Sequence, residues 1–108
     1  MPNTLITCND REALVHPAGD VVAAMVPELR AAMRTAMQNG AREMTIDFSK
    51  VEMVDSTGLG LLISAHNSFN KVGGKIAVIH ASKEILELFR SMRIHQHFSV
   101  SQSAAEEQ

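Results

Sequence analysis

Two adjacent hydroxyl residues, Ser56 and Thr57, follow the carboxylate of Asp55 in the stretch Asp-Ser-Thr-Gly-Leu-Gly over residues 55–60. The alternating apolar pattern of residues 44–48 predicts a strand before this stretch, and the apolar run of residues 59–72 predicts a helix after it. Backbone N–H groups at a helix start lack acceptors within the helix and favour anionic groups. We therefore interpret the stretch as a place suited to hold a phosphate group.

The same residue types also serve simply as helix caps, because Ser, Thr and Asp side chains accept hydrogen bonds from the first N–H groups of a helix. A phosphoryl group on Ser56 would add about 1.5–2 negative charges and three acceptor oxygens beside Asp55. A protein packed over that dianion would have to remove its water or face repulsion from its own acidic groups. If Ser56 is phosphorylated in this way, it acts as a local switch for protein binding.

Hydrophobic periodicity predicts the element order β-β-α-β-α-β-α-β around this site. Strands are predicted over residues 5–8, 12–17, 43–47, 75–80 and 98–100, and the long apolar run of the fourth predicts burial on both faces. Helices are predicted from about Met25 or Val26, over residues 58–71, and after the N-cap Ser82. Asp20 is a candidate N-cap for the first helix, and residues 101–108 are predicted to form a final helical turn or to fray.

This alternation predicts an α/β fold, with a mixed four- or five-stranded sheet packed against three to four helices. The short link between the first two strands predicts an antiparallel edge on an otherwise parallel sheet. We expect one domain over residues 1–108.

Composition argues against several classes of function. The chain of 108 residues has a net charge of −2 and no block of basic residues, so we expect no nucleic-acid binding. Its apolar runs are far shorter than the ~20 residues of a membrane-spanning helix, and its first residues do not resemble a signal peptide. The one cysteine cannot form an internal disulfide, so we expect a cytoplasmic protein. As a binding protein that is itself modified, it is expected to need no cofactor of its own.

Histidine pairs and the Ser56 hydroxyl could also serve metal binding or hydrolysis. His95 and His97 could face one side of a strand, but they lack nearby Cys and carboxylate residues, so we expect surface histidines and no metal. Ser56 could be the nucleophile of a hydrolase, but it lies in Asp-Ser-Thr-Gly and not in Gly-x-Ser-x-Gly. His66 lies on an apolar helical stripe and is predicted to be partly buried, and His80 lies at a strand end. We expect no enzymatic activity.

The string Val-Asp-Ser-Thr-Gly-Leu-Gly over residues 54–60 resembles the STAS domain of anti-sigma factor antagonists. Residues 46–49 before it and 71–76 after it extend the likeness, which spans roughly residues 12–100. In that family the serine directly after the aspartate is phosphorylated by a partner that is both an anti-sigma factor and a serine kinase. The resemblance implies that Ser56 is the phosphoacceptor and that Asp55, Thr57 and Gly58 shape its loop.

One departure from the family pattern falls in the neighbouring loop. Antagonists usually carry Gly-Glu-(Leu/Ile)-Asp where this chain has Gly19-Asp20-Val21-Val22, so Val22 replaces the second acidic residue. Asp20 could supply that carboxylate in a shifted register, and the resemblance makes residues 20–22 part of the partner surface. The apolar residues beside Ser56, Leu59 and Leu61 among them, either extend this surface or are buried because the helix packs on more than one side.

The resemblance implies a regulated binding protein that is a monomer when free. Its unphosphorylated form would bind and sequester a GHKL-type serine kinase/anti-sigma factor, phosphorylation of Ser56 would end that complex, and a PP2C-type phosphatase would restore it. The same switch with a client other than a sigma factor, such as a secretion or biofilm regulator, is equally compatible with these residues.

Overall fold

The elements follow one another along the chain in the predicted order. The structure, a computed structural model, describes residues 5–9, 11–94 and 98–102. Its elements are β1 (Leu5–Asn9), β2 (Glu12–His16), α1 (Val26–Gln38), β3 (Glu43–Asp47), α2 (Ser56–Lys71), β4 (Lys75–Ile79), α3 (Lys83–Ser91) and β5 (Ser99–Val100). The predicted α/β order is confirmed, and α2 begins two residues earlier than predicted.

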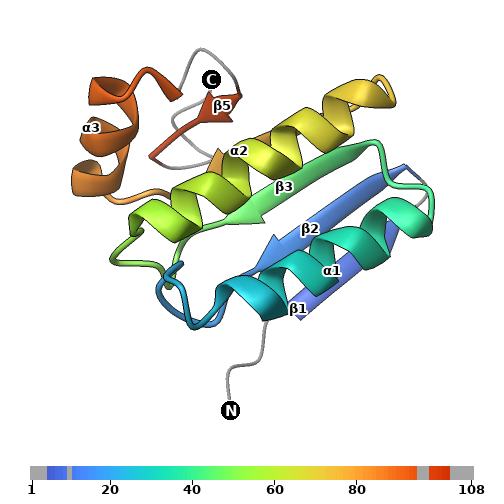
Figure 1. The fold of residues 1–108 in the computed structure, drawn as a ribbon, viewed down its shortest axis with the longest axis horizontal. Coiled ribbons are helices and arrows are strands. Elements are labelled where there is room, and N and C mark those ends of the chain that lie inside the picture. The colour runs from blue at the N-terminus through green and yellow to red at the C-terminus, as the bar shows by residue number, and fades with distance from the viewer. Residues whose placement is uncertain (1–4, 10, 95–97, 103–108) are drawn as a thin grey trace.

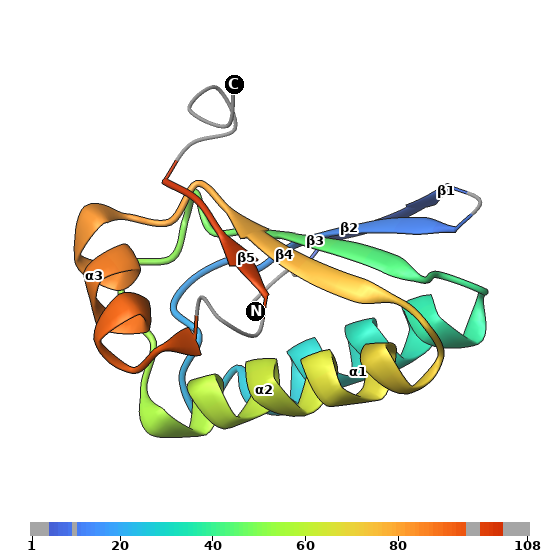
Figure 2. The same ribbon diagram turned by 90° about the horizontal axis from the view of Figure 1, so that it is seen from above.

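The strands form one five-stranded sheet in which their spatial order is their order along the chain. β1 pairs antiparallel with β2, and every later pair is parallel, which confirms the predicted mixed sheet. Crossovers between parallel strands are right-handed, so successive steps in one direction place their helices on the same face. α1 and α2 lie side by side under one face of the sheet (Figures 1 and 2).

This topology explains why the prediction of burial on both faces of β4 was wrong. Ile76 and Val78 are buried under the helices, whereas Ala77 and Ile79 on the opposite face are only half-buried. The apolar run therefore belongs to a strand covered by helices on one side. The fully buried core lies between the sheet and the helix layer.

Short sequence signals set the helix boundaries. Pro27 occupies the first turn of α1, where its missing N–H leaves no bond unmade. Gly40 and Gly73 adopt φ values of 97° and 76° just beyond α1 and α2, a conformation that a side chain disfavours. The Ser82 hydroxyl accepts a hydrogen bond from the Ile85 N–H at 3.1 Å and caps α3, as predicted.

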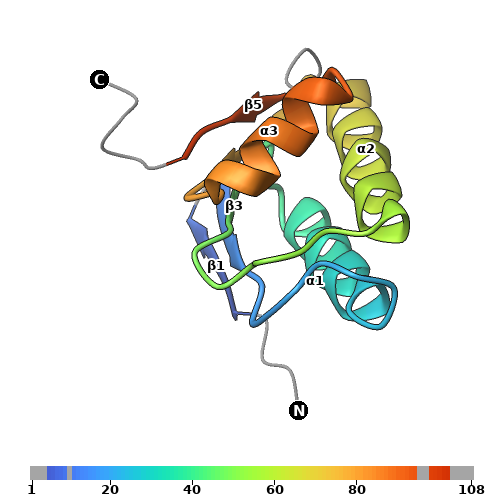
Figure 3. The same cartoon turned by 90° about the vertical axis from the view of Figure 1, so that its left-hand side faces the viewer.

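α3 buries three side chains, those of Ile85, Leu86 and Phe89. Phe89 makes the aromatic contacts. Its ring meets Phe48 and Phe98 edge-on, with centroids 6.3 and 6.5 Å apart. α3 consequently lies beside β5 and the first turns of α2 (Figure 3). Ser101 and Gln102 are not helical, and residues 103–108 of the predicted terminal turn lie outside the described residues.

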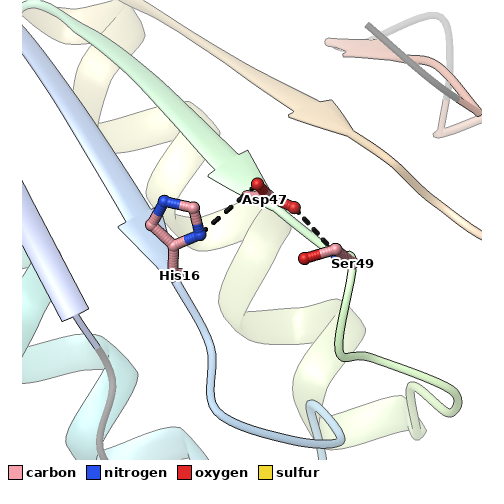
Figure 4. A network of polar contacts seen from close by, with 3 residues as sticks. All are labelled: His16, Asp47 and Ser49. Atoms are coloured by element: carbon pink, nitrogen blue, oxygen red, sulfur yellow. Dashed lines mark hydrogen bonds and ion pairs between the residues drawn. The ribbon is translucent and has the colours of Figure 1, made fainter.

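A polar network fixes the chain where it leaves β3. The buried carboxylate of Asp47 accepts a hydrogen bond from the Ser49 N–H at 2.8 Å, and its second oxygen lies 3.3 Å from Nδ1 of His16 at the end of β2 (Figure 4). These contacts anchor the start of the segment that leads to residue 55. Among the described residues no helix has the length and apolar character needed to cross a membrane.

Candidate functional site

Two loops at the carboxyl ends of the parallel strands lie against each other and carry the predicted site. The 17–25 loop connects β2 to α1, and the 48–55 loop connects β3 to α2. Val21 and Val54 form an isolated parallel bridge between them. The Val21 N–H donates to the Met53 carbonyl at 3.0 Å, and the Asp55 N–H donates to the Val21 carbonyl at 3.2 Å. The backbone of each loop therefore supports the other.

Two carboxylates strengthen this contact, one from each loop. Oδ1 of Asp20 accepts hydrogen bonds from the N–H groups of Glu52 and Met53 at 2.9 and 3.1 Å. Oδ2 of Asp55 accepts from the Ala23 N–H at 3.0 Å. Each aspartate thus binds backbone donors of the opposite loop, which fixes the two loops relative to each other.

The prediction that Asp20 caps α1 was therefore wrong. Met25 occupies the N-cap position of α1 and makes no side-chain capping bond. The carboxylate of Asp20 instead turns to donors 32 and 33 residues further along the chain. An aspartate ahead of a helix indicates a local cap, but a neighbouring loop with free N–H groups can compete for the same oxygens.

Asp55 itself caps α2 and is held ionised by its position. Its Oδ1 accepts the Gly58 N–H at 2.8 Å, in addition to the Oδ2 bond to Ala23. These N–H donors, Gly58 first and Ala23 second, lower the pKa of the Asp55 carboxyl below its ordinary 3.8. A fixed negative charge therefore lies directly beside residue 56.

The depressed pKa of Asp55 predicts a pH-dependent contribution to stability. Replacing Asp55 by Ala should lower the midpoint of urea denaturation at pH 7, because two N–H groups lose a charged acceptor. The stabilisation is complete above the unfolded pKa of about 4 and is lost as the pH falls through the lower folded pKa. The difference between wild type and Asp55→Ala should therefore shrink as the pH drops below about 4.

Ser82→Ala is the matched control for this experiment. Ser82 caps α3 with a hydroxyl, which carries no charge in this range, so its loss should cost about 1 kcal/mol at every pH. A constant difference between wild type and Asp55→Ala from pH 7 to pH 3 would contradict the assigned role of the carboxylate.

Ser56 is the first residue of α2 and its side chain is exposed. Within the described part of the chain its hydroxyl forms no hydrogen bond, so a group attached to Oγ would displace no internal contact. Thr57, the second hydroxyl of the pair, is exposed as well. The oxygen that the sequence analysis singled out is thus accessible at a helix N-terminus, where an anion is favoured.

Gly58 is buried against the neighbouring loop. A Cβ built on it would lie 2.1 Å from the Val21 carbonyl oxygen and 2.8 Å from Cγ1 of Val21. Carbon and oxygen atoms cannot approach this closely, so only glycine allows α2 to begin against the 17–25 loop. The predicted role of Gly58 in shaping the loop thereby gains a physical reason.

Three of the residues predicted for the partner surface and the phosphorylation loop have buried side chains. Val21, Leu59 and Leu61 have exposed fractions of 0%, 6% and 3%. α2 packs against the sheet and α1 and buries more than one side, so Leu59 and Leu61 follow the second of the two alternatives that the sequence left open. These side chains support the loop from within, while Asp20, Val22 and Asp55 are half-buried at its surface.

Both loops expose apolar side chains near Ser56. Met53, with 57% of its surface exposed, is the exposed large apolar side chain nearest in sequence to Ser56 among the described residues. Ala23, Ala24 and Pro27 are exposed on the approach to α1, and Ala23 is held to Asp55. Sequence reasoning overlooked this contribution of the 17–25 loop. The sequence did contain a signal for it, because the 17–25 loop is almost wholly apolar, which is unusual for an irregular segment unless something packs on it.

The histidine of α2 and the candidate metal ligands lie as follows relative to Ser56. His66 lies ten residues along α2, roughly 15 Å away at 1.5 Å per residue, and its ring packs on Phe98 with centroids 6.0 Å apart. In the part of the chain that the structure describes, no group of three or more His, Cys, Asp or Glu residues could hold a metal ion. His95 and His97 lie outside that part.

Comparisons with known proteins agree with this geometry. The curated anti-sigma-B factor antagonist of Staphylococcus aureus (strain NCTC 8325 / PS 47) is 29% identical over 87 residues, 81% of each chain. A crystal structure of an anti-sigma factor antagonist from Mycobacterium paratuberculosis shares the fold with a TM-score of 0.83 at 19% identity, covering 98% of this chain and 90% of that one.

The antagonist SpoIIAA shares the fold in two chemical forms. Its unphosphorylated form has a TM-score of 0.73 at 20% identity and covers 97% of this chain and 92% of its own. The phosphorylated Bacillus SpoIIAA has a TM-score of 0.74 at 17% identity and covers 97% and 96%. A family model described as "Mlab, STAS domain" matches residues 6–101. Nearly the whole described chain, from β1 to the end of β5, thus belongs to the STAS domain family, as its Asp-Ser-Thr-Gly stretch had suggested.

Proposed function

We propose that this protein is an anti-sigma factor antagonist whose binding is switched by phosphorylation of Ser56. The unphosphorylated form binds and sequesters a GHKL-type serine kinase that is also an anti-sigma factor, and so releases the sigma factor. Phosphorylation by that kinase ends the complex, and a PP2C-type phosphatase regenerates the binding form. Such a cycle would run in the cytoplasm, where transcription takes place.

The observation that carries this proposal is the exposed Ser56 hydroxyl within an apolar surface and beside a fixed carboxylate. Met53 and Ala23 offer a partner an uncharged area to pack on. Esterification of Ser56 would place about 1.5–2 further negative charges there, next to the ionised Asp55. A partner packed over this area would have to strip water from the dianion and lie against the added charge of Asp55, which opposes association.

The fold can accept this charge without rearrangement. The bonds between the two loops use the backbone and the carboxylates of Asp20 and Asp55, and none uses the Ser56 hydroxyl. The similarity in fold to SpoIIAA in both its unphosphorylated and phosphorylated forms supports the same conclusion. The anti-sigma-B factor antagonists among the curated relatives support the identity of the partner as an anti-sigma factor.

Incubation with ATP and a GHKL-type kinase from the same genome tests the modification itself. We expect the intact mass to rise by one phosphate, with the phosphopeptide mapped to Ser56. Ser56→Ala should take up none, whereas Thr57→Val, which removes the adjacent exposed hydroxyl, should still be modified. Phosphate on Thr57, or undiminished uptake by Ser56→Ala, would contradict the assignment.

A further inference from the structure

A groove of about 190 Å³ runs between α1 and α2. Its floor is apolar and consists of Met33 and Met37 from α1 with Leu61, Ala65 and Phe69 from α2. The floor extends along α2 from Leu61 to Phe69, eight residues or roughly 12 Å of helix axis. Methionine side chains are flexible and adapt to differently shaped partners. The groove can thus receive an elongated apolar surface.

The two rims of the groove are polar and unequal in charge. Arg30 and Arg34 lie one turn apart on the α1 side, and Ser64 and Ser68 lie one turn apart on the α2 side. All four side chains are exposed. Neither guanidinium forms an ion pair or a hydrogen bond within the described part of the chain, and no carboxylate lines the groove. The arginine rim therefore presents two uncompensated positive charges.

The spacing of these charges selects the form of the occupant. A small amphiphile carries its charge at one end and would engage a single arginine. An amphipathic helix carries side chains at one-turn intervals, so its apolar stripe can lie on the floor while carboxylates four residues apart meet Arg30 and Arg34. Seryl hydroxyls on the opposite rim suit the uncharged polar flank of such a helix.

We propose that this groove receives an acidic amphipathic helix of the same protein that binds at Ser56. This inference rests on the proposed function and deepens it. α1 and α2 start at the two loops and run side by side, so the groove begins about one turn beyond the Ser56 surface (Figure 1). An acidic partner would be attracted by Arg30 and Arg34 and repelled by a phosphate on Ser56, so both charges act on one docked surface.

Binding of the unphosphorylated chain to its cognate kinase/anti-sigma factor, measured by calorimetry, tests this proposal. Arg30→Glu/Arg34→Glu should weaken the complex by about tenfold or more and flatten its salt dependence. Lys83→Glu/Arg90→Glu makes the same change of net charge at exposed positions of α3 and should stay within about twofold of wild type. Ser68→Trp fills the groove without changing charge and should weaken binding as well.

The outcomes separate this inference from the function on which it rests. If wild type binds the kinase and phosphorylation of Ser56 ends the complex, but the groove variants bind equally well, the groove proposal is refuted. The proposed function is unaffected by that result. Wild type that does not bind the kinase overturns both. If light scattering shows a dimer that Arg30→Glu/Arg34→Glu dissolves while the kinase complex is unaffected, the occupant is a second copy and the proposal fails.

Discussion

Protein phosphorylated on Ser56 should bind its cognate anti-sigma factor at least about a hundredfold more weakly than the unmodified protein, a difference of about 3 kcal/mol. The phosphate would lie directly after Asp55 and three residues from the exposed Met53, where a packed partner excludes water. Removing water from an uncompensated dianion opposes association strongly enough to account for this loss. Ser56→Ala should keep the affinity of the unmodified protein, since its hydroxyl makes no bond within the described chain.

Two further variants make this experiment decisive. Ser56→Asp carries a single charge on a shorter side chain, so its affinity should fall between those of Ser56→Ala and the phosphoprotein. Asn70→Asp adds a negative charge at an exposed position in the last turn of the same helix, outside the groove lining and far from the loops, and should bind almost like wild type. Equal affinities for Ser56→Ala, Ser56→Asp and the phosphoprotein, by calorimetry with a catalytically inactive kinase, would refute the electrostatic mechanism.

Gly58→Ala and Gly60→Ala should change stability in opposite directions although both replace glycine by alanine in the first turns of α2. At Gly60 a Cβ meets nothing within 4 Å, so alanine should stabilise the fold by about 0.5–1 kcal/mol through lower backbone entropy in the unfolded chain. At Gly58 the Cβ would lie 2.1 Å from the Val21 carbonyl oxygen, and we expect a net loss of about 2–3 kcal/mol.

The loss at Gly58 outweighs the gain in helix propensity because Val21 cannot move away freely. Its carbonyl accepts the Asp55 N–H and its own N–H donates to Met53, so a shift breaks the bridge between the loops. Urea denaturation of the two variants beside wild type measures both effects. A stabilised Gly58→Ala protein would show that the loops are not in the close contact described above. The same variant should also bind the kinase poorly, because the Ser56 surface is built from both loops.

The parts of the fold that depend on local pattern could be predicted from the sequence. Hydrophobic spacing gave the order of strands and helices, and Ser82 marked the start of α3 because its capping bond reaches only three residues ahead. Asp55 followed the same rule at the start of α2. The exposure of Ser56 could be predicted as well, since few other residues cover the first residue of a helix that begins beyond the carboxyl end of a strand.

The contacts between the loops could not be predicted, because they join residues more than thirty positions apart. The donors of Asp20 belong to the 48–55 loop, and a carboxylate ahead of a helix carries no sign of such a distant partner. The burial of Leu59 and Leu61 depends on how many elements surround α2, which its own periodicity does not reveal. The order of the strands in the sheet places α1 and α2 on the same face, and this leaves the other face of β4 half-exposed. The hydrophobic pattern of a single strand does not reveal that order.

The absence of any internal bond to the Ser56 hydroxyl, among the described residues, has a consequence for how long a signal would last. The fold gains no hydrogen bond from the free hydroxyl and loses none when the hydroxyl is esterified, so no internal bond holds the protein in the unmodified form. The signal would be stored in the covalent phosphoester on Ser56 and not in a conformation that relaxes. Its lifetime would be set by the enzymes that write and erase it, which lets the same scaffold serve a brief response or a lasting one.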